Sequence, residues 1–218
     1  MPSLKPMTVR WLGRVDYAEG LSLQRRLVAQ RREGRIDDTL LLLEHPPVIT
    51  LGRNGDRAHL LEDEQALLAM GIEVHEIGRG GDVTFHGPGQ LVGYPIVRLA
   101  EGEKDAHAYL RNLEQALIEL AAHYGIEARR VPGLTGIWVG DEKLAAIGVR
   151  LSTGWITSHG FAFNVQTDLS CFSTIVPCGI RDKGVTSLAR LLADCPAVDE
   201  VAEVAARTVA RAVAREAA

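Results

Sequence analysis

The chain has 218 residues, of which 46% are hydrophobic and 24% charged, so it can bury a core without disulfides or a structural metal. Its net charge of −4 argues against binding along nucleic acid or an anionic membrane surface. The first residues lack the apolar run of a signal peptide, and no apolar run is long enough for a transmembrane helix, so we expect a soluble cytoplasmic protein.

The first half of the chain predicts several short strands and two helices. Apolar runs bounded by turn residues predict strands over residues 10–15, 39–43, 48–51, 72–77 and 91–97. Helices are predicted from the cap Asp16 to Arg32 and over residues 60–70, where Gly71 ends the second one. Residues 78–96, GRGGDVTFHGPGQLVGYPI, contain six glycines around one histidine.

The second half predicts a long helix, more strands and a final helix. Asp105 can cap a helix whose apolar residues recur on one face until Gly125. Strands follow over residues 126–131, 136–139, 143–151 and 160–165, and an amphipathic helix is predicted over residues 198–217. This order predicts an α+β fold with a mixed or antiparallel sheet. No repeat or linker divides the chain, so we expect a single domain over residues 1–218.

The glycine-rich stretch does not fit a phosphate-binding motif. It has no GxxxxGK[ST] continuation, and Val83 stands where GxGxxG requires its third glycine. Two interpretations remain open for the stretch. It is a loop without a ligand, or its glycines let the backbone lie close to a bound chain while Thr84, His86 and Gln90 present polar groups.

The three cysteines, Cys171, Cys178 and Cys195, have neither the spacing of a metal site nor the even number of a disulfide framework. Cys178 lies between a proline and a glycine, a setting that suits a presented nucleophile, although any free cysteine can simply be a small buried residue. Lys143 opens an apolar strand, where it is either a solvated residue or, beside a thiol, a group that favours the thiolate.

Together these segments resemble the octanoyltransferase family of lipoate biosynthesis. The stretch Arg79-Gly80-Gly81-Asp82-Val83-Thr84-Phe85-His86, with Gly89-Gln90 and Tyr94, fits the signature RGGxxT[aromatic]HxxGQxxxY. The similarity continues through residues 143–150, 159–165 and 177–180, in the order of the family. It therefore covers most of the chain.

The resemblance implies the catalytic-domain fold shared with biotin and lipoate ligases, with a central mixed sheet. It implies transfer of an octanoyl group from acyl carrier protein to a lysine of lipoyl domains, namely those of 2-oxoacid dehydrogenase E2 subunits and the glycine cleavage H protein. It implies neither a cofactor nor a metal, and no nucleic-acid or membrane partner.

The resemblance also assigns roles to residues. Cys178 would form the octanoyl thioester, and Lys143 would favour the thiolate and accept a proton from the incoming amine. Backbone N–H groups near Gly179 or in the glycine-rich stretch would stabilise the oxyanion. His86 would support the end of the site near the reaction. The substrate-contact residues would be Arg79, Gly80, Gly81, Asp82, Val83, Thr84, Phe85, His86, Ala146, Ile147, Gly148, Gly160, Phe161 and Ala162, whose small members leave an apolar slot.

Three rival interpretations remain. An ATP-dependent lipoate ligase on the same fold would not need Cys178. A non-catalytic acyl-binding protein would need neither Cys178 nor Lys143. A Cys/His hydrolase would use His86 as the base and release the free acid.

Overall fold

The computed structural model describes residues 7–180 and 183–213. The strands are β1 Met7–Arg14, β2 Asp38–Glu44, β3 Val48–Leu51, β4 Glu73–Glu76, β5 Val83–His86, β6 Gln90–Ile96, β7 Arg129–Val131, β8 Leu134–Val139, β9 Glu142–Ser152, β10 Ile156–Asn164 and β11 Gly184–Val185. The α-helices are α1 Tyr17–Arg32, α2 Glu64–Ala69, α3 Ala106–His123, α4 Leu188–Leu191 and α5 Val198–Val213. Four 3-10 turns complete the list: η1 Arg57–His59, η2 Glu101–Glu103, η3 Leu169–Thr174 and η4 Pro177–Gly179.

The main sheet has the order β1-β2-β6-β10-β9-β8-β7, and β11 pairs with β9 outside this path. The pairs β1–β2 and β9–β11 are parallel and the others antiparallel, so the sheet is mixed, as predicted. A second sheet has the order β4-β3-β5. The central strands β2, β6 and β10 are almost wholly buried because both faces of the main sheet are covered.

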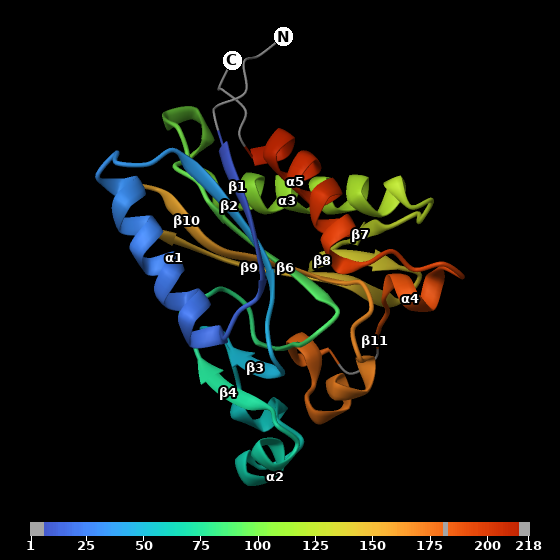
Figure 1. Cartoon of the computed structure of the whole chain (residues 1–218). Coiled ribbons are helices and arrows are strands. Elements are labelled where there is room, and N and C mark those ends of the chain that lie inside the picture. The colour runs from blue at the N-terminus through green and yellow to red at the C-terminus, as the bar shows by residue number, and fades with distance from the viewer. Residues whose placement is uncertain (1–6, 181–182, 214–218) are drawn as a thin grey trace.

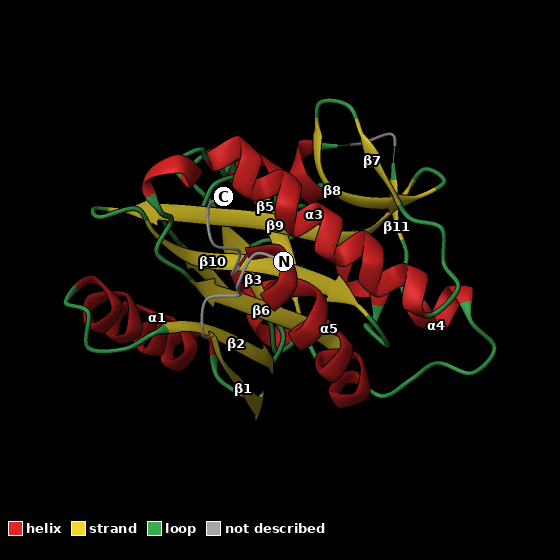
Figure 2. Ribbon diagram, turned by 90° about the horizontal axis from the view of Figure 1, so that it is seen from above, coloured by secondary structure: helices red, strands yellow, loops and turns green. Residues whose placement is uncertain are grey.

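Helices α3 and α5 cover one face of the main sheet, and α1 lies against the other (Figures 1 and 2). The apolar face of α3 explains its place, since Leu113, Leu117 and Leu120 are fully buried against α5 and the sheet. The small sheet and α2 lie on the side opposite α3 and α5, where they enclose a separate apolar cluster with η3 (Figure 1). The glycine-rich stretch joins the two sheets, since it contains β5 of the small sheet and β6 of the main sheet.

Most element predictions are confirmed, with three corrections. The helix predicted over residues 60–70 is shorter and begins at Glu64, because Asp63 caps it by accepting from Ala66 N–H, and residues 60–63 are not helical. Asp16 lies at the start of α1, but its side chain makes no capping hydrogen bond. The strand predicted over residues 160–165 begins at Ile156. The last predicted helical residues, 214–217, lie outside the described residues.

Candidate active site

Cys178 and Lys143 lie together in the structure. The Lys143 ammonium donates a hydrogen bond to Cys178 Sγ over 3.1 Å, although 35 positions separate the two residues. Lys143 is only 6% exposed, and its Nζ also lies 4.8 Å from the centre of the Trp138 ring. A buried ammonium beside sulfur favours the thiolate, which is the reactive form of cysteine.

The backbone around the pair explains how it forms. Cys178 has φ of 55°, a left-handed conformation that a side chain rarely adopts, and it lies in η4 between Val176 and Ile180. Lys143 is held on β9, whose first residues pair in parallel with β11. Because β11 follows the cysteine segment directly, this pairing brings the two parts of the chain to one place.

The other two cysteines have no such partner. Burial raises the pKa of the Cys171 thiol, with a further contribution from the charge of Asp168. Burial also raises the pKa of Cys195. Neither residue contacts a lysine or arginine in the described structure, so Cys178 is the best-placed nucleophile.

A narrow slot runs from Cys178 along one face of the main sheet. Its floor is a set of paired small residues, Ala146 opposite Ala162 and then Gly148 opposite Gly160. Each two-residue step along these strands advances about 7 Å. An extended eight-carbon acyl chain spans about 9 Å from its carbonyl carbon to its methyl carbon, so it would end just past the glycine pair.

The two glycines of the floor, Gly148 and Gly160, allow other backbone segments to come close to the sheet, and this is their main structural role. A Cβ at Gly148 would lie 2.9 Å from the carbonyl oxygen of Gly80, and one at Gly160 would lie 2.1 Å from that of Gly93. Glycine at these positions therefore lets residues 79–81 cross β9 and lets β6 approach β10. The slot exists because the backbone of residues 79–81 roofs the sheet.

Arg79 closes one side of the slot. Its guanidinium donates to the Thr50 carbonyl oxygen over 2.7 Å and to the Thr50 hydroxyl over 2.8 Å, and only 8% of the residue is exposed. Burial lowers the pKa of Arg79, but an arginine remains charged. Arg79 thus contributes a fixed wall tied to β3.

The inner end of the slot is a cluster of aromatic rings with polar atoms. The ring of Tyr17 stacks on that of His86 with centroids 6.3 Å apart, and His45 Nε2 lies 2.8 Å from the Tyr94 hydroxyl. Burial lowers the pKa of His86 to about 3 and that of His45 to about 4. Burial and the charge of Arg79 lower the pKa of His159 to about 4. At neutral pH this end is therefore uncharged and suits an apolar chain.

Several predicted contact residues lie elsewhere than expected. Val83 and Phe85 point away from the slot into the small apolar cluster, because successive residues of β5 alternate between faces. His86 stacks on Tyr17 in the ring cluster, and both His86 and Thr84 line the slot that Cys178 also lines. That His86 supports the end of the site near the reaction stays a prediction.

Of the two predicted locations for the oxyanion donors, the glycine-rich stretch fits the structure better. The Gly179 N–H donates to Val176 O and the Ile180 N–H to Pro177 O, so neither is free. The N–H of Gly81 has no acceptor among the described residues, and Gly81 lies in the glycine-rich stretch beside Cys178. Gly81 is therefore the better candidate.

The remaining predicted residues line the slot or its mouth: Gly80, Asp82, Ala146, Ile147, Gly148, Gly160 and Ala162. Phe161 also borders the slot, but its ring is buried in the cluster under α3 and α5. Sequence reasoning did not assign Tyr17, His45 or His159 to the site. His159 has φ of 56°, and its ring lies 6.4 Å from that of Tyr94. The similar segment 159–165 included it, but nothing in the signature pointed to Tyr17 or His45.

The mouth of the slot is an open cavity of about 460 Å³ that Lys143 and Cys178 both line. His59 also lines this cavity, and its Nδ1 lies 2.6 Å from Asp82 Oδ2. The other carboxylate oxygen of Asp82 accepts from the N–H of Asp56 over 3.1 Å. The mouth therefore holds a carboxylate and imidazole pair beside the nucleophile.

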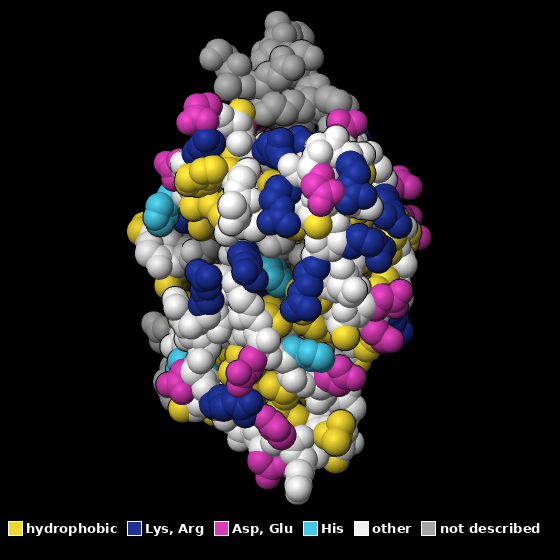
Figure 3. All heavy atoms as spheres, turned by 90° about the vertical axis from the view of Figure 1, so that its left-hand side faces the viewer, with side chains coloured by type: hydrophobic (Ala, Val, Ile, Leu, Met, Phe, Trp, Pro, Cys, Tyr) yellow, Lys and Arg dark blue, Asp and Glu magenta, His cyan; other side chains and the backbone are white. Residues whose placement is uncertain are grey.

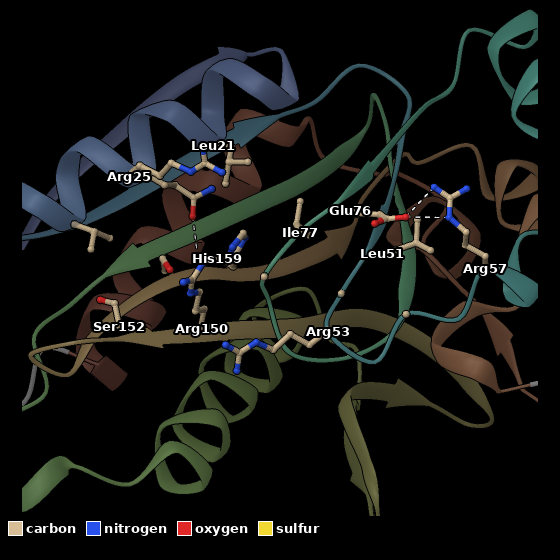
Figure 4. Close-up of a pocket in the computed structure, with 16 residues that line it drawn as sticks. Leu21, Arg25, Leu51, Arg53, Arg57, Glu76, Ile77, Arg150, Ser152 and His159 are labelled. Atoms are coloured by element: carbon tan, nitrogen blue, oxygen red, sulfur yellow. Dashed lines mark hydrogen bonds and ion pairs between the residues drawn. The ribbon is translucent and has the colours of Figure 1, made fainter.

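A larger cavity of about 800 Å³ adjoins the inner end of the slot, with His159 lining both. Figure 4 shows Arg25 from α1 on one wall and Arg53 and Arg150 on the opposite side. These three arginines make no ion pair with any described residue. Lysine and arginine side chains gather across the middle of this face of the molecule (Figure 3).

The described residues show neither a metal-binding cluster nor a helix that could cross a membrane. Over residues 7–180 and 183–213, no three His, Cys, Asp or Glu side chains gather where they could hold a metal ion. No described helix is long and apolar enough to span a membrane.

Comparisons with known proteins match nearly the whole chain. The family model described as the lipoyl protein ligase A/B catalytic domain matches residues 16–210. The chain belongs to this family. An octanoyltransferase of Solibacter usitatus is 56% identical over 203 residues, covering 93% of this chain and 91% of that protein. An octanoyltransferase of Rubrobacter xylanophilus is 59% identical over 181 residues, covering 83% of this chain and 81% of that protein.

Solved members of the wider fold confirm the fold prediction. A lipoate-protein ligase A bound with ATP has a TM-score of 0.72 at 17% identity, covering 96% of this chain and 85% of that chain. A putative lipoate protein ligase from T. acidophilum with bound lipoic acid has a TM-score of 0.71 at 16% identity, covering 96% and 86%. At such identities the likeness establishes the fold alone.

Proposed function

We propose that this protein transfers an octanoyl group from an acyl carrier protein to a lysine of lipoyl domains, through a thioester on Cys178. Octanoyl transfer in protein lipoylation follows from the family relationship, since relatives at 47–59% identity over most of the chain are octanoyltransferases. The protein is therefore an acyltransferase. The carrier, the intermediate and the named residues are our proposals, with the chain acting as a single catalytic domain.

The observation that carries the mechanism is the 3.1 Å contact between Lys143 Nζ and Cys178 Sγ at the open end of an apolar slot. The Cys178 thiolate attacks the carbonyl carbon of the carrier thioester, and the carrier leaves as a thiolate that takes a proton from water. The lysine of a lipoyl domain then attacks the new thioester, and cysteine sulfur leaves. Exchange between thioesters is nearly balanced, so amide formation drives the sequence.

We propose that the acyl chain lies between residues 79–81 and the Ala146/Ala162 and Gly148/Gly160 pairs. Each buried methylene contributes roughly 0.8 kcal/mol. Backbone N–H of Gly81 is the proposed donor to the oxyanion of each tetrahedral intermediate. The acceptors we expect are lipoyl domains of 2-oxoacid dehydrogenase E2 subunits and of the glycine cleavage H protein.

The arginine-lined face is our proposed docking surface for the acidic carrier protein. Arg25, Arg53 and Arg150 concentrate positive charge on a molecule of net charge −4, and no described acid neutralises them. Complementary charge of this kind speeds encounter and orients the partner. Arg53→Glu with Arg150→Glu should raise KM for the octanoyl carrier about tenfold, while KM for octanoyl-pantetheine stays unchanged. Arg207→Glu, on α5, is the control.

Intact-mass analysis tests the function directly. Incubation with octanoyl carrier protein, without ATP, should give an octanoyl adduct on the Cys178 peptide that an apo lipoyl domain discharges. Cys178→Ala should abolish the adduct, Lys143→Ala should slow its formation by at least a hundredfold, and Cys171→Ala should change neither. No adduct, or one lost to water as fast as to the acceptor, would refute the proposal. A requirement for ATP and free acid would favour a ligase.

A further inference from the structure

The second half of the transfer needs a group to receive a proton. The acceptor amine is neutral when it attacks, and its nitrogen must lose a proton before a stable amide forms. That group must lie at the mouth of the slot, because the acceptor lysine approaches Cys178 from there. The titratable residues that line the mouth cavity in the described structure are His59, Asp82, Lys143 and Cys178.

Lys143 is poorly suited to this task. Its ammonium lies 3.1 Å from Cys178 Sγ and 4.8 Å from the centre of the Trp138 ring, and it is almost fully buried. The face of the Trp138 ring and the sulfur of Cys178 both attract the ammonium and hold it in place. Lys143 is therefore best used as a fixed counter-ion for sulfur.

The histidines inside the slot are also unsuitable. Burial holds the pKa of His86 at about 3 and that of His159 at about 4, so neither keeps a proton near neutral pH. His86 is moreover held by Gln90, whose Oε1 lies 2.8 Å from its Nδ1. Only the histidine at the mouth remains.

The geometry of His59 fits a proton acceptor. Its Nδ1 lies 2.6 Å from Asp82 Oδ2, a contact between an imidazole and a carboxylate that is not aligned as a hydrogen bond, and Nε2 is the ring nitrogen nearer to Gly179. A neutral imidazole can accept a proton on this nitrogen. A Cβ built on Gly179 would lie 3.1 Å from His59 Cε1 and 3.6 Å from Nε2. The Cε1–Nε2 edge of the His59 ring thus lies against Gly179, the residue that follows Cys178. The His59 side chain remains 24% exposed there.

We propose that His59 Nε2 accepts the proton that the acceptor amine loses as it attacks the octanoyl thioester on Cys178. Asp82 is the positioning residue that orients the ring. This inference rests on the proposed function and replaces the expectation that Lys143 accepts this proton.

One C–N bond forms and one C–S bond breaks in this step. The nitrogen lone pair forms the C–N bond, one N–H proton passes to His59 Nε2, and the C–S electron pair returns to sulfur. The products are the amide, the Cys178 thiolate beside the Lys143 ammonium, and a protonated His59 that releases its proton to water. No oxidant, nucleotide or metal is required.

Single-turnover measurements on His59→Gln separate the two half-reactions. Octanoylation of Cys178 by octanoyl carrier protein should stay within about twofold of the wild-type rate. Discharge of the isolated octanoyl-enzyme by apo lipoyl domain should fall about a hundredfold, the usual size of general-base catalysis. Asp82→Asn should lower the discharge rate by a smaller factor. In His59→Gly, added imidazole should partly restore the discharge rate. His123→Gln is the control, since His123 is an exposed histidine at the end of α3, where its ring contacts Tyr124, and it lines neither the slot nor its mouth.

The pH profile of discharge gives a readout that a structural role would not move. Cys178 is acylated and cannot titrate, so the charged groups that face His59 in this experiment are Asp82 and Lys143, with Asp56 beside Asp82. Discharge by the wild-type protein and by His59→Gln should differ in their dependence on pH, because only the wild-type protein carries the imidazole base at the mouth. Hydroxylamine, which needs no base at neutral pH, should discharge both proteins equally.

Two results would overturn this inference. One is an unchanged discharge rate and pH profile in His59→Gln. The other is an equal loss of rate in both half-reactions of His59→Gln. That result would mean that His59 and Asp82 only stabilise the conformation of the turn that carries Cys178. Failure of the wild-type protein to form the adduct at all would instead count against the proposed function.

Discussion

Replacing Tyr17 with leucine should lengthen the acyl chain that the protein prefers. Tyr17 is 3% exposed, closes the inner end of the slot beside His86, and its hydroxyl has no hydrogen-bond partner among the described residues. Leucine has about four fewer non-hydrogen atoms, which leaves room for two more methylenes without orphaning a partner.

The expected size follows from that room. Two methylenes at roughly 0.8 kcal/mol each give about 1.6 kcal/mol, which corresponds to about a fifteenfold change in the ratio of kcat/KM for decanoyl over octanoyl carrier. The value is an upper limit, because neighbouring rings can move into the space. The wild-type slot ends where an eight-carbon chain ends. For the wild-type protein, the ratio of kcat/KM for decanoyl over octanoyl carrier should therefore be well below one.

A competition assay measures this ratio directly. Equal amounts of octanoyl and decanoyl carrier are offered, and intact mass reports which adduct forms on Cys178. Tyr109→Leu is the control, because Tyr109 is also 3% exposed but lies on α3, in the core cluster away from the slot. An unchanged ratio in a folded, active Tyr17→Leu protein would show that Tyr17 does not close the slot.

Three further outcomes are expected. Gly179→Ala should slow octanoylation at least tenfold in the single-turnover assay, since Gly179 has φ of 70° and a Cβ would press within 3.1 Å of the mouth carboxylate and imidazole. The free energy of unfolding, measured in urea, should fall as the pH drops from 6.5 to 5. In this range the histidines of the unfolded chain take up protons, whereas the buried His45, His86 and His159 stay neutral, because their folded pKa values are about 4, 3 and 4. Each of the three contributes up to roughly 2 kcal/mol to this loss of stability. A free energy of unfolding that does not change with pH would contradict the prediction. Glu114→Gln should cost about 1 to 3 kcal/mol and lower Tm by several degrees, because the fully buried carboxylate accepts from two arginines and a backbone N–H; an unchanged Tm would contradict it.

Cys178 and Lys143 could be singled out from the sequence as candidates, but local sequence alone did not assign their roles. A cysteine between proline and glycine is also compatible with a small buried residue, and a lysine opening an apolar strand with a solvated one. The resemblance then joined them, and the structure places them 3.1 Å apart. Their roles remain predictions that the adduct experiment tests.

The contact list was less predictable because a motif does not record which way each side chain points. All eight residues from Arg79 to His86 were expected to contact substrate, yet alternation along β5 sends Val83 and Phe85 into a separate core. His86 stacks on Tyr17, which lies outside the motif. Only the register of β5 against β3 decides these directions.

The sequence by itself determined the family, the mixed α+β fold and the cysteine and lysine pair, because these depend on local patterns and on a long specific motif. Tertiary structure alone decided what closes the slot and what stands at its mouth. Tyr17 and His45 come from outside the motif, and His59 meets Asp82 across 23 positions of chain. Such pairings arise from the packing of α1, η1 and the two sheets, and no local pattern in the chain encodes them.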